Sequence, residues 1–271
     1  MTSLEQTREA WENGADAYDR LLTATDTQAA EEALRRAGVG PGTRLLDIAA
    51  GGGALSVPAA RLGGEVLAVD FSRAMVELLR RRAERLGLTN LDVRVMDGTQ
   101  LDLPDASFDV AGSVLGIMLF PDRARGLSEM ARVLRKGGTG LMLTLGPPPA
   151  VEPFGLFLEA LLEAVPGFTP PAASPLFCLA DPEVLRAELE AAGLSSVEAE
   201  PFAATLPVES PESLWEPLVA GAPAAEGILE GLPEDRVRAA REVFEGKLRG
   251  RAGGDGSLTL TVTFNIGIGR K

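Results

Sequence analysis

The hydrophobic positions of this chain follow two different periods. Short apolar runs bounded by glycine or turn residues, such as 43–49 and 65–70, predict buried strands. The segments between such runs carry apolar residues at every third or fourth position, which predicts helices. Strands separated by helices of this length are typical of an α/β fold, a mainly parallel sheet with helices on both faces. The expected strands are 43–49, 65–70, 91–96, 108–114, 140–145, about 195–206 and 257–266.

Capping and turn residues place the helices. The helix expected over 181–192 begins with Asp181-Pro182 and is followed by Gly193, residue types that start and stop helices. Residues 257–266 instead alternate polar and apolar strictly, which predicts an edge or antiparallel strand. The expected helices are 4–21, 27–37, 54–62, 73–87, 122–135, 181–192, 210–220, 223–230 and 233–249.

The composition of the sequence changes at residue 146. The run Gly146-Pro147-Pro148-Pro149 cannot continue a strand, and the segment up to 177 is apolar. We expect its phenylalanines to serve partly as core and partly as a wall for a ligand, and Trp215 to add to an apolar lid. A single domain is expected over 1–271. Its sheet core would span about 40–146, 179–208 and 256–271, with a lid of N-terminal helices and insertions over about 1–38, 147–178 and 209–250.

A glycine turn followed by an acid is the most informative motif. The apolar run 45–48 leads into three consecutive glycines at 51–53, and a helix-like segment follows at once. Glycine removes the Cβ that would keep a ligand off the main chain and permits the dihedrals of a strand-to-helix turn. The next strand ends at Asp70, about twenty residues after the turn, a spacing typical of an acid that binds ribose hydroxyls. The motif predicts a site for an adenosine-type ligand.

Net charge excludes some partners. The chain has 39 Asp and Glu against 26 Lys and Arg, a net charge of −13. Such a surface repels phosphate backbones and anionic membranes, so we expect neither nucleic acid nor a membrane as partner. The basic cluster Arg80-Arg81-Arg82 with Arg85 lies on a helix whose other face is apolar, and is interpreted as a solvated face, with a docking patch as the alternative.

The missing histidine excludes several mechanisms. Ser-His-Asp hydrolysis, Cys-His proteolysis and the usual zinc sites need an imidazole, and the chain has none. No acidic cluster has the spacing of metal ligands, so no metal is expected. Cys178 is the single cysteine and is expected to pack. With no secretory pattern at the start and no run of about 18–20 apolar residues, we expect a cytoplasmic protein.

Four blocks in order resemble the class I S-adenosylmethionine-dependent methyltransferases, and most of all the small-molecule branch with the ubiquinone and menaquinone C-methyltransferases. The blocks are 47–53, Asp70, 96–98 and 132–138, within about residues 40–145. Ala49 stands at the family's first glycine, and Lys136 stands where the family has proline. The resemblance implies a Rossmann-like, seven-stranded sheet with an antiparallel C-terminal strand, and S-adenosyl-L-methionine as cofactor.

The resemblance also implies roles for residues at the adenosine end of the cofactor. Asp70 would accept hydrogen bonds from both ribose hydroxyls. The ring of adenine needs apolar faces and an acceptor at its edge. Phe71 and Met75 are candidates for the faces, with plain core as the alternative for Met75. The candidates for the edge are Asp97, Gly98 and Thr99.

At the other end of the cofactor, Ala49 and Gly51 would approach the methionine part with main chain. Val114 and Leu115 would lie near the sulfonium, and Tyr18 would close over the ligand or pack in an N-terminal helix with Trp11. Two readings stay open for Asp47, which either contacts the ligand or only fixes the glycine turn.

The implied reaction is methyl transfer to a small, largely apolar metabolite, for which O-, N- and C-acceptors all stay open. A sulfonium is an activated donor, so the protein must mainly align the reactants in a water-poor pocket. No catalytic residue is assigned. A base would be needed only for an acceptor that must lose a proton, and Asp16, Glu152 and Glu209 are candidates.

Two other functions compete. A nicotinamide-dependent oxidoreductase would share Gly51-x-Gly53 and Asp70, but Ser56 stands where its third glycine belongs. A non-catalytic binding or partner module with a methyltransferase fold is the other alternative. The chain is expected to be a monomer or a homodimer.

Overall fold

Seven strands form one sheet in the computed structural model, which describes residues 23–170, 174–221, 223–253 and 257–271. The strand order is β3-β2-β1-β4-β5-β7-β6. Pairing is parallel from β3 through to β5, and β7 runs antiparallel to both of its neighbours. The predicted mainly parallel sheet is confirmed. The strands are β1 (Arg44–Ile48), β2 (Glu65–Asp70), β3 (Leu91–Val95), β4 (Phe108–Val114), β5 (Leu134–Leu145), β6 (Ser195–Val208) and β7 (Leu258–Arg270).

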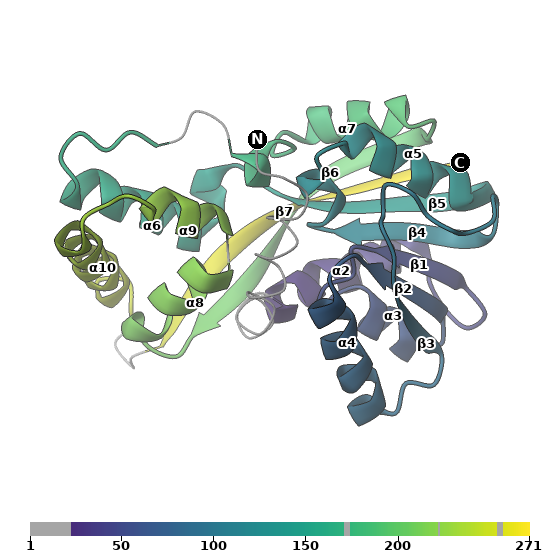
Figure 1. Ribbon diagram of the computed structural model, residues 1–271, viewed down its shortest axis with the longest axis horizontal. Helices are drawn as coiled ribbons and strands as arrows, with labels where there is room; N and C mark the ends of the chain where they lie inside the picture. The colour runs from purple at the N-terminus through teal and green to yellow at the C-terminus, as the bar shows by residue number, and fades with distance from the viewer. Residues whose placement is uncertain (1–22, 171–173, 222, 254–256) are drawn as a thin grey trace.

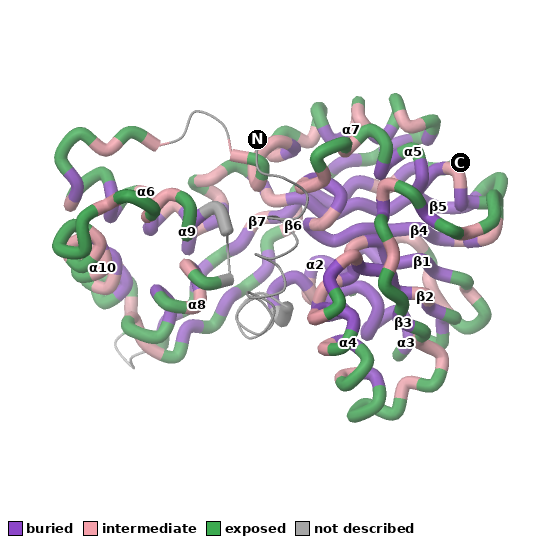
Figure 2. Tube along the Cα trace, in the orientation of Figure 1, coloured by how far each residue is buried: buried purple, intermediate pink, exposed green. Residues whose placement is uncertain are grey.

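Helices cover both faces of the sheet, and the central strands between them are buried (Figure 2). Figure 1 shows α5 and α7 on one side and α2, α3 and α4 on the other. The expected helix over 4–21, with Trp11, Asp16 and Tyr18, lies outside the described residues. The helices are α2 (Thr23–Ala37), α3 (Ser56–Arg61), α4 (Arg73–Leu86), α5 (Arg123–Val133), α6 (Glu152–Ala164), α7 (Pro182–Ala191), α8 (Trp215–Gly221), α9 (Pro223–Leu229) and α10 (Glu234–Arg249).

Some element boundaries differ from the prediction. The helix expected over 54–62 forms only over Ser56–Arg61, and β7 continues to Arg270. Strand β5 is counted from Leu134, but its pairing with β4 jumps from Phe108↔Leu134 to Val110↔Thr139. The excursion between them contains Gly137 at φ 77°, a conformation that suits glycine. The block 132–138 therefore does contain the turn predicted there, inside the limits of the strand.

The far ends of β6 and β7 leave the main sheet and carry a second lobe. Strand β7 pairs with β5 only as far as Phe264, but it continues to pair with β6 down to Val208↔Leu258. Helices α6, α8, α9 and α10 gather around this two-stranded ribbon in Figure 1. An isolated ribbon is marginally stable in water, so it needs a hydrophobic face packed against other elements.

Aromatic side chains of the insertions provide that packing. Phe157, Trp215 and Phe244 are at most 3% exposed, with ring centroids 5.5 Å apart in each successive pair. Phe154 is also buried, while Phe168 and Phe177 are half-buried. Phe154 and Phe157 therefore belong to the expected core part of the segment, and Trp215 packs in the apolar second lobe as expected. A ligand wall formed by the remaining phenylalanines stays a prediction.

Across the described ranges, no helix has both the length and the apolar character needed to cross a membrane.

Candidate functional site

A strained turn follows β1. Ala49 and Gly51 adopt φ values of 57° and 50°, and Gly53 one of 89°. The left-handed conformation costs an L-residue about 1–2 kcal/mol, so Ala49 holds this geometry against its own preference. A Cβ added at Gly116 would come 2.5 Å from the Cβ of Ala49, so this glycine accommodates the alanine. The turn thus presents main chain rather than side chains to the space above it.

Asp70 ties the turn to the next helix. Its Oδ2 accepts a hydrogen bond from Gly51 N (2.9 Å), and its Oδ1 accepts one from Ser72 N (2.9 Å). Ser72 is the N-cap of α4, where its side chain accepts from Met75 N. A carboxylate offers sites for about four hydrogen bonds, so Asp70 can brace the main chain and bind a ligand together.

Asp47 lies beneath the turn. It is 1% exposed, and Ser56 Oγ donates to its Oδ2 at 2.5 Å, while Oδ1 has no hydrogen-bond partner among the described residues. Burial raises the pKa of Asp47 to about 7 against the effect of the Ser56 hydrogen bond, and the nearby charge of Asp70 adds to the rise. Asp47 does not line the pocket described next, which agrees with the interpretation that it fixes the turn.

A pocket opens at the carboxyl ends of β1, β2 and β4, and it encloses about 950 Å³ when the part open to solvent is included. The sheet order reverses between β1 and β4, where open α/β sheets bind ligands. Asp70 and Asp97 are its charged residues, and no Lys or Arg is among the described residues that line it. The predicted site residues that line it are Ala49, Gly51, Asp70, Phe71, Met75, Asp97, Gly98, Thr99, Val114 and Leu115.

The sequence interpretation missed one wall of the pocket. Phe120 and Pro121, which follow the short 3₁₀ helix Ile117–Leu119 in the connection after β4, line it together with Gly116 and Leu119. The Phe120 ring fits against two glycines, since a Cβ would lie 2.7 Å from it at Gly98 and 2.6 Å from it at Gly126. An aromatic residue within the connection that follows a strand's carboxyl end, here Phe120 before Pro121, was a signal that could have identified this wall.

Gly98→Ala should therefore disturb the pocket. The new Cβ would lie 2.7 Å from Phe120 and 2.8 Å from Ile48, so the ring of Phe120, which lines the pocket, or its neighbours must shift. We expect a loss of about 1–2 kcal/mol in free energy of unfolding, typical of overpacking, measured by urea titration. Gly40→Ala is the matched control, because nothing lies within 4 Å of its added Cβ. Equal stability of the two variants would contradict the packing described.

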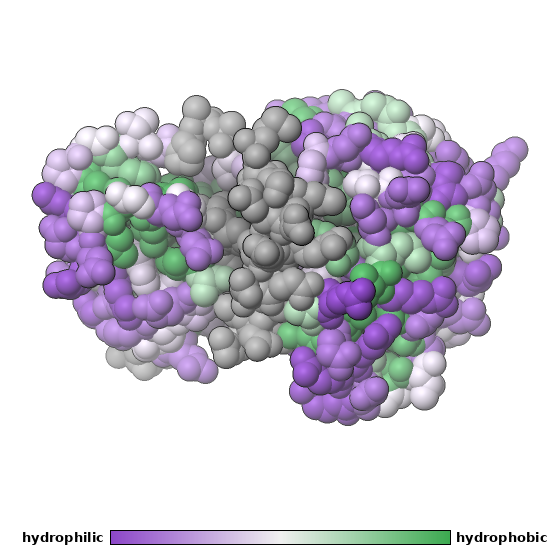
Figure 3. Space-filling model, in the orientation of Figure 1, coloured by the Kyte–Doolittle hydropathy of each residue, from purple (hydrophilic) through white to green (hydrophobic). Residues whose placement is uncertain are grey.

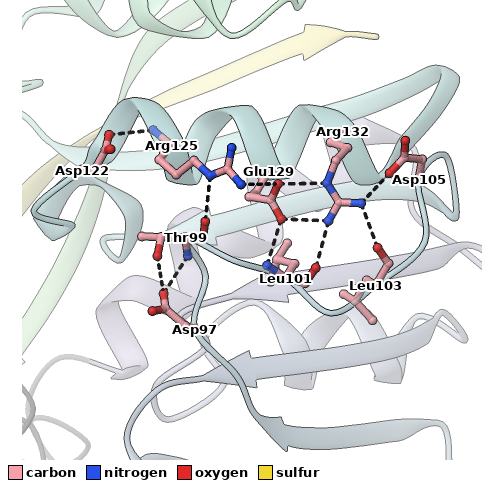
Figure 4. A network of polar contacts seen from close by, with 9 residues as sticks. All are labelled: Asp97, Thr99, Leu101, Leu103, Asp105, Asp122, Arg125, Glu129 and Arg132. Carbon is pink, nitrogen blue, oxygen red and sulfur yellow. Dashed lines mark hydrogen bonds and ion pairs between the residues drawn. The ribbon is translucent and has the colours of Figure 1, made fainter.

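The acid after β3 is held by its own loop. Asp97 is exposed, and its Oδ1 accepts hydrogen bonds from Thr99 N (2.8 Å) and Thr99 Oγ1 (2.7 Å). Arg125 of α5 in turn donates from Nε to the Thr99 carbonyl (3.1 Å), as Figure 4 shows. The loop that carries Asp97 is thus fixed both by its own hydrogen bonds and by α5.

Two arginines of α4 also support the site. Hydrophilic residues cover α4 in Figure 3, as expected for a solvated face. However, Arg80 donates from Nη2 to the Val93 carbonyl (2.6 Å), and Arg82 donates to the carbonyl of Gly52 in the glycine turn. Arg80, Arg81 and Arg85 are exposed, as a solvated face requires, although Arg80 also hydrogen-bonds to main chain. The solvated-face interpretation is wrong for Arg82, which is half-buried and bound to the glycine turn.

Two of the candidate bases, Glu152 and Glu209, are not among the described residues that line the pocket, and Asp16 lies outside the described residues. Glu152 accepts hydrogen bonds from Thr261 N and from Arg251 Nη1 (2.9 Å) in the second lobe. Glu209 is exposed just after β6. Within the part of the chain that the structure describes, no group of three or more His, Cys, Asp or Glu side chains is arranged to hold a metal ion.

Cys178 is half-buried and packs beside the pocket wall. Its Sγ donates to the Met118 carbonyl at 3.5 Å and accepts from Arg123 at 3.4 Å. Burial raises the pKa of its thiol above the ordinary value, which keeps it protonated and disfavours a nucleophilic role.

Comparisons with known proteins agree with this geometry. The family model described as a methyltransferase domain matches residues 46–142. The demethylmenaquinone methyltransferase of Clavibacter sepedonicus is 34% identical over 199 residues, which cover 68% of this chain and 80% of that protein. The crystal structure of the YcgJ protein from Bacillus subtilis superposes with a TM-score of 0.59 at 19% identity, over 90% of this chain and 98% of the other, and shows a shared fold.

Another match is more local. A protein of Mycobacterium bovis named as uncharacterized, Mb1440c, is 40% identical over 103 residues, which cover 38% of this chain. The match spans 37% of that relative, so this chain corresponds to little more than a third of its length.

Proposed function

Because this chain belongs to the class I S-adenosylmethionine-dependent methyltransferases, we propose that it binds S-adenosylmethionine and transfers the methyl group to a small organic molecule. The observation that carries the proposal is Asp70. Its carboxylate lies in the pocket wall, and the main-chain amides of Gly51 and Ser72 fix its orientation. Vicinal ribose hydroxyls are donors that suit such a carboxylate.

The charge of the pocket supports a cationic ligand. S-adenosylmethionine carries a sulfonium, and the described lining has two acids and no base. In this proposal Asp97, with Gly98 and Thr99, takes the adenine edge, and Phe71 and Met75 take its faces. Met75 is 2% exposed and still borders the pocket, so its two expected roles are compatible.

The remaining lining suits the reactive end. Ala49 and Gly51 present main chain to the methionine part, and Val114 and Leu115 supply apolar contacts near the sulfonium. The cofactor supplies an activated methyl group, so the protein's own residues mainly align the acceptor and exclude water. We assign no base. Tyr18, whose family counterpart closes over the cofactor, keeps that role as a proposal.

We infer that the acceptor enters between the sheet and the second lobe. In this proposal the lid consists of the second lobe, with the far ends of β6 and β7. Helix α2, which the sequence predicted to be part of the lid, instead packs on the sheet (Figure 1), where Ala29, Ala33 and Leu34 are buried in the main core. The apolar end of the pocket, with Leu119 and Phe120, supports a small and largely apolar acceptor. O-, N- and C-methylation all fit this lining. Demethylmenaquinone is a sensible first candidate, because a relative is named for it.

The alternatives fit less well. A dinucleotide carries two phosphates, which two pocket carboxylates without a basic residue would repel. Ser56 also replaces the third glycine of the nicotinamide fingerprint, and its hydroxyl holds Asp47 instead. A non-catalytic module would bind the cofactor and release no product.

Calorimetry and a turnover assay test the proposal. We expect S-adenosylmethionine to bind with micromolar affinity and NAD not to bind. Incubation with methyl-labelled cofactor and a panel of quinones, phenols, amines and β-dicarbonyl compounds should then yield S-adenosylhomocysteine and one labelled product. NAD binding in place of S-adenosylmethionine would overturn the assignment, and cofactor binding without transfer to any acceptor would favour the binding module.

We also propose a cytoplasmic protein that acts as a monomer or homodimer without nucleic acid or membrane. The net charge of −13 supports the absence of polyanionic partners. Light scattering after gel filtration and a gel-shift titration with DNA and RNA would test these points.

A further inference from the structure

One face of α5 holds the whole loop between β3 and β4. Arg125, Glu129 and Arg132 are spaced by four and three residues, so they share a side of the helix. Figure 4 shows all three directed toward the loop that runs from Asp97 to Asp105. We term these three residues the loop clamp.

Arg132 is the centre of the clamp. Its Nε and Nη2 form a two-pronged pair with the Glu129 carboxylate at 2.9 and 2.8 Å. The same guanidinium donates to the carbonyls of Leu101 (3.0 Å) and Leu103 (2.8 Å), and to Asp105. A planar guanidinium can serve these acceptors together, which a lysine cannot do.

Glu129 completes the attachment from the buried side. It is 4% exposed, and its Oε2 accepts a hydrogen bond from Leu101 N at 2.8 Å. The hydrogen bonds from Arg132 hold the pKa of Glu129 below its usual range, so the carboxylate stays charged at neutral pH. Both main-chain groups of Leu101 are therefore fixed to α5.

Arg125 extends the clamp to the residues that line the pocket. It donates to the Thr99 carbonyl, and Thr99 orients Asp97 through two hydrogen bonds to Oδ1. Thr99 thus uses one oxygen of the carboxylate and sets the direction of the other. The start of the same helix follows Phe120, which also lines the pocket, and the Phe120 ring packs against Gly98 of the loop.

We propose that the loop clamp makes the site selective for adenine, by positioning the Asp97 carboxylate to accept a hydrogen bond from the exocyclic amino group. This inference rests on the proposed function. Arg125, Glu129 and Arg132 are positioning residues, since none of them needs to touch the ligand. An inosine-type base, which has a carbonyl oxygen in place of the amino group, meets the same carboxylate as a repelling acceptor.

The ratio of two affinities tests the proposal. S-adenosylhomocysteine and S-inosylhomocysteine differ in the exocyclic group and in the N1 proton that accompanies the 6-carbonyl, and calorimetry gives the Kd of each. The parent protein should prefer the adenine ligand by about tenfold or more, and Asp97→Asn should remove the preference. Arg125→Met should lower the ratio by about threefold, and Arg132→Lys by about tenfold, because lysine cannot hold the loop at several points.

Arg123→Met is the matched control. Arg123 lies on the same helix and pairs with Glu188 at 2.6 Å, and none of its recorded contacts involves the loop, so the ratio should stay at the parent value. A purely structural weakening would lower both affinities together and leave the ratio unchanged. An unchanged ratio in Arg125→Met and Arg132→Lys, with Asp97→Asn non-selective, would overturn the inference alone. Failure of the parent to bind either ligand would overturn the proposed function.

Discussion

Asp70→Asn should weaken the binding of S-adenosylmethionine by about 2–3 kcal/mol, a loss of roughly 30- to 150-fold in affinity. The substitution removes the charge that faces the ribose. It also turns an NH₂ group toward one of two main-chain donors, Gly51 N or Ser72 N, which both now meet carboxylate oxygens. The ligand therefore loses a partner and the glycine turn loses an anchor. Calorimetric titration measures the change.

A control variant distinguishes the effect of losing one negative charge anywhere on the protein from the effect of losing it in the pocket. Asp102 is exposed in the loop after β3 and does not line the pocket, so Asp102→Asn makes the same charge change outside the site. We expect its affinity for the cofactor to stay within about twofold of the parent value, because exposed charges interact weakly through water. Unaltered affinity in Asp70→Asn, with an intact circular dichroism spectrum, would remove the ribose role from this residue.

The parts of the site that are local in sequence could be predicted. The glycine turn, Asp70 and Asp97 each follow the end of a strand, and parallel strands bring their carboxyl ends to one edge. The spacing of the apolar residues was sufficient to locate the seven strands along the chain. The run of alternating residues near the end also predicted the antiparallel β7.

The supports of the site could not be predicted in the same way. Arg82 donates a hydrogen bond to the carbonyl of Gly52, and Arg132 donates to the carbonyls of Leu101 and Leu103. Every residue has a main-chain carbonyl, so the sequence does not indicate which of them accept hydrogen bonds from side chains. An arginine on a polar helix face has the same pattern whether it is solvated or bonded in this way. Only the packing of the helices on the sheet distinguishes the two.

Aromatic composition could not divide the core of the lid from a ligand wall. The sequence predicted that the phenylalanines of the insertions serve both uses, because apolar residues in a lid suit either one. The ribbon of β6 and β7 leaves the main sheet and must bury one face, and Phe157, Trp215 and Phe244 meet that need. The apolar character of the acceptor is therefore better argued from Leu115 and Leu119 at the pocket than from the lid.

Asp47→Asn should abolish a pH-dependent loss of stability that the Asp47 carboxyl causes in the parent. The folded protein holds the Asp47 proton up to about pH 7, whereas the unfolded chain releases it near the ordinary pKa of 3.8. Between these values the folded state binds more protons, so the free energy of unfolding of the parent falls as pH rises and then levels off above pH 7. Asparagine does not titrate, and its amide resembles the protonated acid in shape.

The stability difference between Asp47→Asn and the parent should therefore grow by about 3 kcal/mol in favour of the variant between pH 5 and pH 8, at 1.36 kcal/mol for each unit up to the folded pKa. Urea unfolding at four pH values measures it, and comparison with the parent cancels every other titrating group. Ser56→Ala provides the internal check. Removing the hydroxyl that donates to Oδ2 takes away a contact that lowers the pKa, so the decline should continue to higher pH than in the parent. Parallel profiles for the parent and Asp47→Asn would mean that the carboxyl beneath the glycine turn is already ionised at pH 5. The raised pKa would then be wrong, and the turn would rest on a buried charge.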